Sequence, residues 1–224
     1  MVQKKEYDLA SVAYEKIKQM IVEHELHPGD KIQQDVLAKK LGVSRTPLIT
    51  ALNRLQSEKF VEYELNKGYT VRRFSLKELV DIWTLRTAIE RMVVEEIAEK
   101  ISDEEIKSLR QIFEGFTPPW DDEKYSEYTR ADRKFHNELL KMSSNSFVPQ
   151  FIQLFDIVRW SYQDGLVRFP EETLVEHHLI IDALEAHDVD KVVELITDHH
   201  KKSKESLEFA LRQFVNISKE LKHS

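Results

Sequence analysis

The stretch VLAKKLGVSRTPLITALNRL, residues 36–55, decides the fold of the N-terminal part of this chain. Its first half has an apolar side formed by Val36, Leu37 and Leu41, and Gly42 interrupts the pattern. Ser44 is a good N-cap for a second helix, and Pro47 is tolerated in the first turn, where amides have no helical partner. Apolar residues then recur at helical spacing, at Leu48, Ala51, Leu52 and Leu55. The stretch predicts a helix-turn-helix, and the alternative is an ordinary helical hairpin.

Elements on both sides of this stretch complete a winged helix. An amphipathic helix is expected over about residues 9–24, and HPGD at 27–30 is a strong turn signal. After the helix-turn-helix, residues 60–65 and 69–71 form two short alternating runs around a turn that contains Gly68. This pattern is typical of a β-hairpin. Three helices followed by a hairpin favour DNA binding over the plain helical hairpin.

The expected DNA contacts follow from the geometry of such motifs. The N-terminal residues of the second helix of a helix-turn-helix reach into the major groove. We therefore expect Arg45 to contact a base, and Ser44 and Thr46 to contact phosphates or neighbouring bases. Lys67 and Gly68 lie at the expected tip of the wing, where a lysine would contact phosphate.

Four segments of the first 73 residues carry a specific resemblance. They are PGD at 28–30, LAKKLGVSRTPL at 37–48, LNRL at 52–55 and NKGYTV at 66–71. Together they resemble the winged helix of the GntR family of bacterial transcription regulators. The chain departs from that family at Ile49 and Thr50, where an Arg-Glu pair is usual, and at Glu58-Lys59-Phe60, where EGL is common. The missing arginine predicts an operator that differs from the usual one of the family.

Charge and composition divide the chain into two domains, 1–74 and 75–224. The net charge is −7, but residues 1–74 carry 13 Lys/Arg against 10 Asp/Glu, so the acidic excess lies in the remainder. A mildly basic module would attract phosphates locally. There is no Cys, which excludes disulfides and thiolate metal sites. With no apolar run near ~20 residues and no signal-peptide pattern, we expect a soluble cytoplasmic protein without a membrane partner.

The second domain shows only helical patterns. A capping box at Ser102 and Glu105 marks one helix start. The expected helices cover about residues 75–100, 102–113, 123–142, 147–167, 171–186 and 189–219. About six helices joined by short turns predict an antiparallel all-α bundle. The predicted fold class is therefore mainly α, with an N-terminal winged helix-turn-helix followed by a helical bundle.

Helical phase separates the two histidine doublets of this bundle into inward and outward members. His177 shares a helix face with Ile180, Ile181 and Leu184, whereas the face of His178 continues with Asp182 and Glu185. His199 continues the apolar stripe of its helix, and His200 is one step off that stripe. We therefore expect His177 and His199 to point into the bundle.

Asp132 and His136 add a carboxylate and a third imidazole from another helix. Their i, i+4 spacing places them on one helix face, and Leu139 and Leu140 predict that His136 points inward. Alone, this would be a surface pair, and a lone inward histidine is usually a packed core residue. Three imidazoles and a carboxylate from three helices suit Zn, Ni, Mn or Fe. Four such ligands on an octahedral ion would leave two positions for a bidentate carboxylate.

A second resemblance covers the helical half. It rests on LRTAIE at 85–90, DRKFH at 132–136, Asn145, and EHHLIIDALEAHD at 176–188 followed by His199. These segments resemble the FCD ligand-binding domain of the FadR subfamily of GntR regulators. The resemblance implies that Asp132, His136, His177 and His199 hold a divalent metal, and about six helices favour the VanR-like branch. His187 is a departure, because the family often has Gly in that turn.

The sequence therefore predicts a ligand-responsive transcription regulator. We expect a homodimer, a repressor, that binds a double-stranded DNA operator and a small organic acid effector at the metal. Two alternatives remain: a metal-sensing regulator without an organic effector, and a metal-dependent hydrolase-type enzyme. The enzyme is disfavoured because no convincing Glu or Asp base lies beside the expected ligands.

Two residues are the expected effector contacts. Arg86 lies on a helix rich in apolar residues and could bind the effector carboxylate bidentately. An ion pair between Arg86 and Glu90 is the open alternative. Thr173 precedes His177 by one turn on the same face, so its hydroxyl could reach a ligand held by the metal. Arg159 is a weaker option, because its helix phase is ambiguous.

Overall fold

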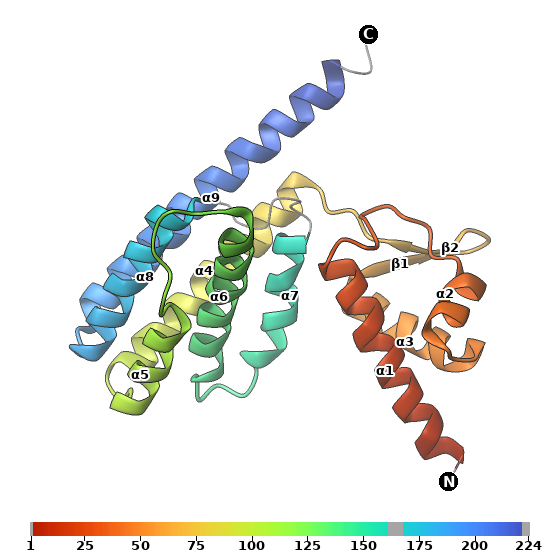
Figure 1. Cartoon of the computed structure of the whole chain (residues 1–224), viewed down its shortest axis with the longest axis horizontal. Helices are drawn as coiled ribbons and strands as arrows, with labels where there is room; N and C mark the ends of the chain where they lie inside the picture. The colour runs from red at the N-terminus through yellow and green to blue at the C-terminus, as the bar shows by residue number, and fades with distance from the viewer. Residues whose placement is uncertain (1, 161–167, 221–224) are drawn as a thin grey trace. The chain divides into compact units, whose positions relative to one another are not determined.

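The structure is a computed structural model that describes residues 2–160 and 168–220. The main boundary between its two compact units lies between Ser75 and Leu76. The first unit contains α1 (Val2–Val22), α2 (Gln34–Leu41), α3 (Arg45–Ser57), β1 (Val61–Glu64) and β2 (Gly68–Val71) (Figure 1). Six helices follow within the described residues: α4 (Leu76–Ala98), α5 (Asp103–Ile112), α6 (Asp122–Lys141), α7 (Pro149–Trp160), α8 (Pro170–Glu185) and α9 (Val189–Glu220).

The core of the first unit lies where α1 packs on α3. Its largest buried side chains are Tyr14, Ile17, Ile21, Leu48, Leu52, Leu55 and Phe60. Gly42 ends α2 in the left-handed conformation, with φ of 68°, and its N–H bonds to the carbonyls of Ala38 and Lys39. This turn sets α3 at its angle to α2. Within α2 only Leu37 is buried; Val36, expected on the apolar side, is 61% exposed, because a helix this short buries one narrow stripe.

The wing is an antiparallel hairpin of β1 and β2. Val61 pairs with Val71 and Tyr63 pairs with Tyr69; Val61, Tyr69 and Val71 are buried, whereas Tyr63 is 47% exposed. Asn66 adopts a positive φ of 68° in the turn, a conformation that Asn tolerates better than most residues. An isolated bridge between Lys31 and Thr70 attaches the segment before α2 to the hairpin. The predicted winged helix-turn-helix is confirmed.

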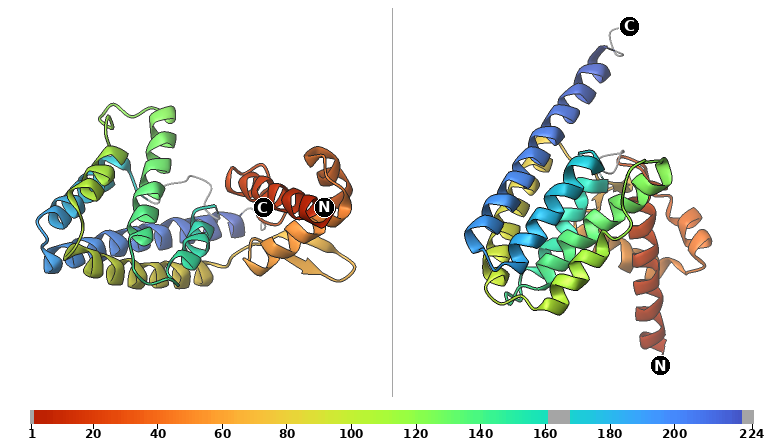
Figure 2. Two further views of the ribbon diagram at one scale, coloured as in Figure 1. Left: turned by 90° about the horizontal axis from the view of Figure 1, so that it is seen from below. Right: turned by 60° about the vertical axis from the view of Figure 1, so that its left-hand side comes forward.

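The second unit is a helical bundle. Helix α9 runs beside α4 and α8, α5 packs on α8 and α6, and α6 also contacts α4 (Figures 1 and 2). The bundle core contains Val93, Ile97, Leu109, Phe113, Phe135, Leu139, Ile180, Leu184, Val192 and Ile196. Ser102 and Glu105 form the expected capping box. The predicted helices occur close to the expected limits, although 161–167 lie outside the described residues. In the described ranges no helix is both long and apolar enough to span a membrane.

The turn between α8 and α9 explains one unusual residue. His187 has a positive φ of 52°, a conformation that most side chains avoid. Its Nδ1 atom lies 2.8 Å from the carbonyl oxygen of Ala98, at the end of α4. This contact attaches the turn to a neighbouring helix, so a histidine side chain offsets part of the cost of the left-handed backbone.

Candidate functional site

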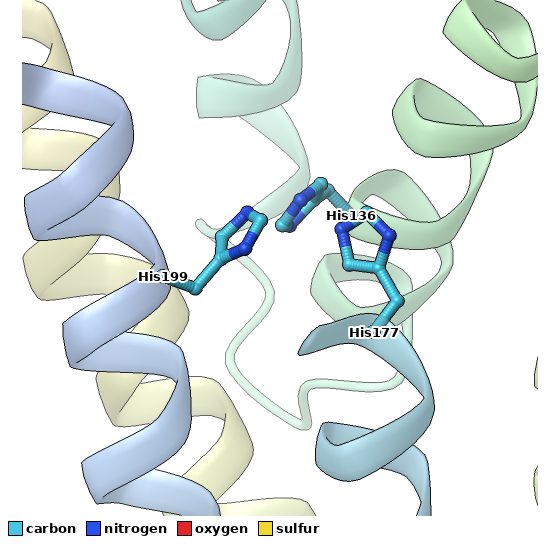
Figure 3. Close-up of side chains that lie close together, drawn as sticks. All are labelled: His136, His177 and His199. Carbon is cyan, nitrogen blue, oxygen red and sulfur yellow. The ribbon is translucent and has the colours of Figure 1, made fainter. Parts of the chain in front are cut away.

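Three buried imidazoles from three helices face one another in the bundle. His136 lies on α6, His177 on α8 and His199 on α9, and Figure 3 shows their rings turned toward a common point. One nitrogen of each ring lies within 4.8 Å of the corresponding nitrogens of the other two. Ligand nitrogens bound to one ion at about 2.1 Å would be closer together than this limit, within reach of small side-chain rotations. The inward orientation expected from helical phase is the one observed.

The fourth expected ligand lies beside this cluster. Asp132 is one turn before His136 on α6, and its Oδ1 atom is 3.6 Å from Nε2 of His177. The Asp132 side chain is 17% exposed, whereas the His177 side chain is fully buried. The structure thus brings together all four residues that the sequence selected.

A tyrosine orients the central imidazole. The hydroxyl of Tyr128, on α6, lies 3.1 Å from Nδ1 of His177 and 2.8 Å from Oγ1 of Thr173. The other nitrogen of His177, Nε2, is buried and has no hydrogen-bond partner among the described residues. A buried polar atom without a partner is costly, so an atom in this position is suited to a ligand.

The electrostatics of the cluster favour neutral imidazoles. Burial lowers the pKa of His177 well below its usual value, and nearby His199 and His136 lower it further. Burial also lowers the pKa of His199, although the neighbouring Glu176 acts in the opposite direction. Neutral imidazoles carry the lone pair that a metal needs, and the Asp132 carboxylate completes a nitrogen and oxygen donor set. The residues therefore fit a divalent transition metal.

Three polar residues around the cluster were not selected from the sequence. Glu90, on α4, is fully buried, and its Oε2 atom lies 2.5 Å from Nδ1 of His136 and 3.0 Å from Nε2 of His200. His200 is buried rather than turned outward, because α9 packs against both α4 and α8 and so buries a wider stripe. Glu176 contacts His199 although it lies on a different face of α8 from His177. Glu90 lies seven residues after Trp83 and three before Val93, on the buried stripe of α4, so helical periodicity could have found it.

Both expected effector contacts have partners inside the protein. Nε of Arg86 lies 2.6 Å from Oε1 of Glu90, which is the ion pair that the sequence left open as the alternative. Thr173 is buried one turn before His177 and also contacts the carbonyl oxygen of Phe169 at 3.3 Å. The side chain of Arg159 lies outside the described part of the chain.

Comparison with known families explains the arrangement. Residues 9–71 match the bacterial regulatory proteins of the gntR family, and residues 81–202, more than half of the chain, match the FCD domain. The chain belongs to the GntR family. Both resemblances inferred from sequence motifs are confirmed: a GntR winged helix is followed by a helical FCD domain.

Curated relatives of this GntR chain are transcriptional regulators. It is 35% identical over 129 residues to the Nta operon transcriptional regulator of Aminobacter aminovorans, covering 56% of this chain and 60% of that protein. It is 27% identical over 137 residues to the gluconate operon transcriptional repressor of Bacillus subtilis, covering 61% and 56%. The HTH-type transcriptional repressor GlaR of Escherichia coli is 24% identical over 197 residues, covering 83% and 90%. The matches to the first curated relatives thus span about 60% of those proteins.

Solved structures of GntR regulators have the same fold. E. coli McbR/YncC aligns with a TM-score of 0.73 at 20% sequence identity, covering 89% of this chain and 96% of that protein. A putative GntR regulator from Rhodococcus aligns with a TM-score of 0.66 at 21% identity, covering 88% and 96%. The family and the relatives named above are transcriptional regulators rather than enzymes.

The expected DNA contacts of this GntR chain lie on the surface of the first unit. Ser44, Arg45 and Thr46 are exposed at the start of α3, and the Ser44 side chain makes no capping hydrogen bond. Lys67 is 70% exposed at the wing, 2.7 Å from Glu64, and Gly68 follows with φ of 85°. Because Glu64 partly neutralises Lys67, the wing should attract phosphate less strongly than an unpaired lysine would.

Proposed function

We propose that this protein is a homodimeric DNA-binding transcription repressor whose activity depends on a small carboxylate bound at a divalent metal. Residues 1–74 would bind the operator, and residues 75–224 would bind the metal and the effector. The proposed metal ligands are Asp132, His136, His177 and His199. The observation that carries this proposal is the buried, unpartnered Nε2 atom of His177, which faces two other imidazoles and a carboxylate.

The operator is proposed to be read from the start of α3. Arg45 is exposed there, and a guanidinium can bind O6 and N7 of guanine bidentately. Ser44 and Thr46 would contact phosphates or adjacent bases. Lys67 and Gly68, at the wing, would contact the sugar-phosphate backbone of the DNA. One winged helix covers one half-site, so a two-fold dimer would match a palindromic operator.

The effector class follows from the donor set. When bound, the metal would supply positive charge and open coordination positions for a carboxylate. Thr173 lies one turn from His177, so its hydroxyl is the proposed hydrogen-bonding group for a hydroxy or sugar acid. Arg86 remains a candidate for the effector carboxylate only if its pair with Glu90 opens. The six described helices that follow Ser75 support a VanR-like branch.

Two experiments test this function. Selection of random double-stranded DNA by the full-length protein should enrich a short palindrome. Zn, Ni, Mn and Fe content is then measured, and metal-loaded and chelated proteins are titrated calorimetrically with a panel of hydroxy and sugar acids. Acid binding only by metal-loaded protein is expected. Equal binding by chelated protein would overturn the role of the metal, and a change in DNA affinity caused by metal alone would favour the metal-sensing alternative.

A further inference from the structure

Two carboxylates lie within hydrogen-bond distance of Nδ1 of two proposed metal ligands, His136 and His199. Oε2 of Glu176, on α8, lies 2.9 Å from Nδ1 of His199 on α9. Oε2 of Glu90, on α4, lies 2.5 Å from Nδ1 of His136 on α6. Neither carboxylate belongs to the group formed by His136, His177 and His199, and each contacts Nδ1 of its imidazole, which leaves Nε2 of that ring for another ligand.

Each of these carboxylates is in turn paired with an arginine. Arg168 approaches Glu176 with Nη1 at 2.6 Å from Oε2 and Nη2 at 2.9 Å from Oε1, and the Arg168 side chain is only 6% exposed. Nε of Arg86 lies 2.6 Å from Oε1 of Glu90. A fully or partly buried carboxylate with an arginine partner stays ionised. The same three-part arrangement of arginine, carboxylate and imidazole thus occurs twice, on different helices.

An ionised carboxylate fixes the tautomer of the imidazole that it contacts. A carboxylate without a proton only accepts hydrogen bonds, so Nδ1 of His136 and Nδ1 of His199 must carry the hydrogen. The lone pair of each ring is then on Nε2, and neither ring is free to turn about its Cβ–Cγ bond without losing a charge-assisted hydrogen bond. Such outer partners also make the imidazole a stronger base and a stronger ligand.

A second cation site is the competing interpretation of Glu90. Three potential ligand atoms lie within 4.8 Å of one another, one each from Glu90, His136 and His200. These three residues could therefore also bind an ion. Arg86 argues against this interpretation, because a divalent ion on Glu90 would lie close to the guanidinium that already neutralises the carboxylate. His200 is then a second imidazole held beside Glu90, at 3.0 Å, rather than a ligand.

We propose that Glu90 and Glu176 are positioning residues that do not bind the metal but orient His136 and His199 so that both bind through Nε2. This inference rests on the proposed metal site and adds how the ligands are held and how many ions are bound. Loss of such an outer partner typically weakens metal affinity about 10- to 100-fold. Each chain is expected to bind one ion.

The first test substitutes Glu176, which is accessible to solvent at its edge. Full-length wild type, Glu176→Gln and Glu176→Ala are titrated with Co²⁺ and Zn²⁺ in competition with a chelator, and the Co²⁺ absorption spectrum is recorded. We expect affinity to fall about tenfold in Glu176→Gln and further in Glu176→Ala, with an altered Co²⁺ spectrum. Thermal unfolding of the metal-free proteins separates this effect from a merely structural one.

A matched control lies one turn away on the same helix. Glu172 also contacts Arg168, with Oε2 at 2.9 Å from Nη2, but its side chain is 58% exposed. Among the described residues Glu172 pairs with Arg168 and with no imidazole, so Glu172→Gln should leave the metal affinity and the Co²⁺ spectrum unchanged. If Glu172→Gln and Glu176→Gln weaken metal binding equally, the effect arises from Arg168 and the proposal is wrong.

The second test concerns Glu90. Because Glu90→Gln alone would leave Arg86 without its carboxylate, the double variant Arg86→Gln/Glu90→Gln is used. One ion per wild-type chain and weakened binding by the double variant are expected. Two ions per wild-type chain, with one lost in the double variant, would instead assign Glu90 and His200 to a second cation site. No metal binding by wild type would overturn the proposed function itself, whereas tight binding by wild type and Glu176→Gln alike would overturn only this inference.

Discussion

The hydroxyl of Tyr128 lies 3.1 Å from Nδ1 of His177, and the two groups are buried together in the bundle. Burial raises the pKa of Tyr128, and the nearby Asp132 carboxylate raises it further, so the phenol remains neutral. This contact occupies one nitrogen of His177 and leaves the other, Nε2, as the atom that meets Asp132 and the other imidazoles. The chemistry of the site therefore depends on a hydrogen bond between two helices.

His177→Ala should abolish metal binding and effector response while leaving operator binding largely intact. The variant removes the imidazole that lies beside Asp132 and is grouped with the other two imidazoles. His177 belongs to the second unit, so the substitution leaves the residues of the first unit unchanged. Metal analysis and gel-shift titration with the selected operator check both parts. His178→Ala is the matched control, because His178 is only half buried and lies outside the cluster. Full metal loading of His177→Ala would contradict the assignment.

Arg45→Ala should weaken operator binding by about 1–3 kcal/mol and relax base preference at one position of each half-site. Arg45 is exposed at the start of α3, where a side chain can reach a base edge. Gel-shift titration against operators that vary at each position measures the effect. Arg130→Ala removes an exposed arginine from α6 of the other unit and should not change affinity. Unchanged affinity of Arg45→Ala for the operator would remove Arg45 from the interface.

Arg86→Ala should lower the free energy of unfolding by about 3 kcal/mol, because it leaves the Glu90 carboxylate buried without its cation. Urea denaturation measures this change. Arg86→Met/Glu90→Gln removes both charges and should recover part of the loss. If Arg86 serves the effector instead, Arg86→Ala would keep wild-type stability and lose affinity for the acid in calorimetry.

Gly29→Ala should destabilise the first unit more than Gly42→Ala, by about 1 kcal/mol. Both glycines have positive φ, 93° and 68°, so alanine is strained at either position. At Gly29 a Cβ would also lie 2.1 Å from Nε of Arg73, which donates a hydrogen bond to the Pro28 carbonyl, whereas nothing lies within 4 Å at Gly42. Urea denaturation measures the stability of both glycine variants, first alone and then each combined with Arg73→Ala. In the Arg73→Ala background the difference in stability between the two glycine variants should disappear. A difference that persists would place its cause outside this contact.

The metal-free protein should lose stability as the pH falls from about 6.5 toward 4. Burial lowers the pKa of His200 from 6.5 to about 4, so in this interval the unfolded chain binds a proton that the folded chain does not. Stability therefore falls with pH, by on the order of 3 kcal/mol from His200 at most, and His177 and His199 act in the same direction. Urea denaturation in chelator at several pH values measures the slope. A flat profile across this range would contradict the burial of neutral imidazoles.

The sequence alone determined the element order and the helix faces that carry His136, His177 and His199. Helices turn by a constant angle per residue, so apolar spacing was sufficient to select His136, His177 and His199 and to place Asp132 beside His136. The turn residues predicted the winged helix, because Gly42 and the residues around Gly68 mark its two turns. These are local properties, and the bounds of the helices agree with them.

Only the tertiary structure decided which polar groups surround those imidazoles. Glu90 and His136 are 46 positions apart, and Tyr128 and His177 are 49 apart, so no local spacing relates them. Helical phase assigned His200 to the outside because it treats each helix as having one buried stripe. In the bundle α9 packs against α4 and α8 at once, so a second stripe is buried. How many faces of a helix are covered depends on its neighbours, and that information lies in the packing rather than in the period of a single helix.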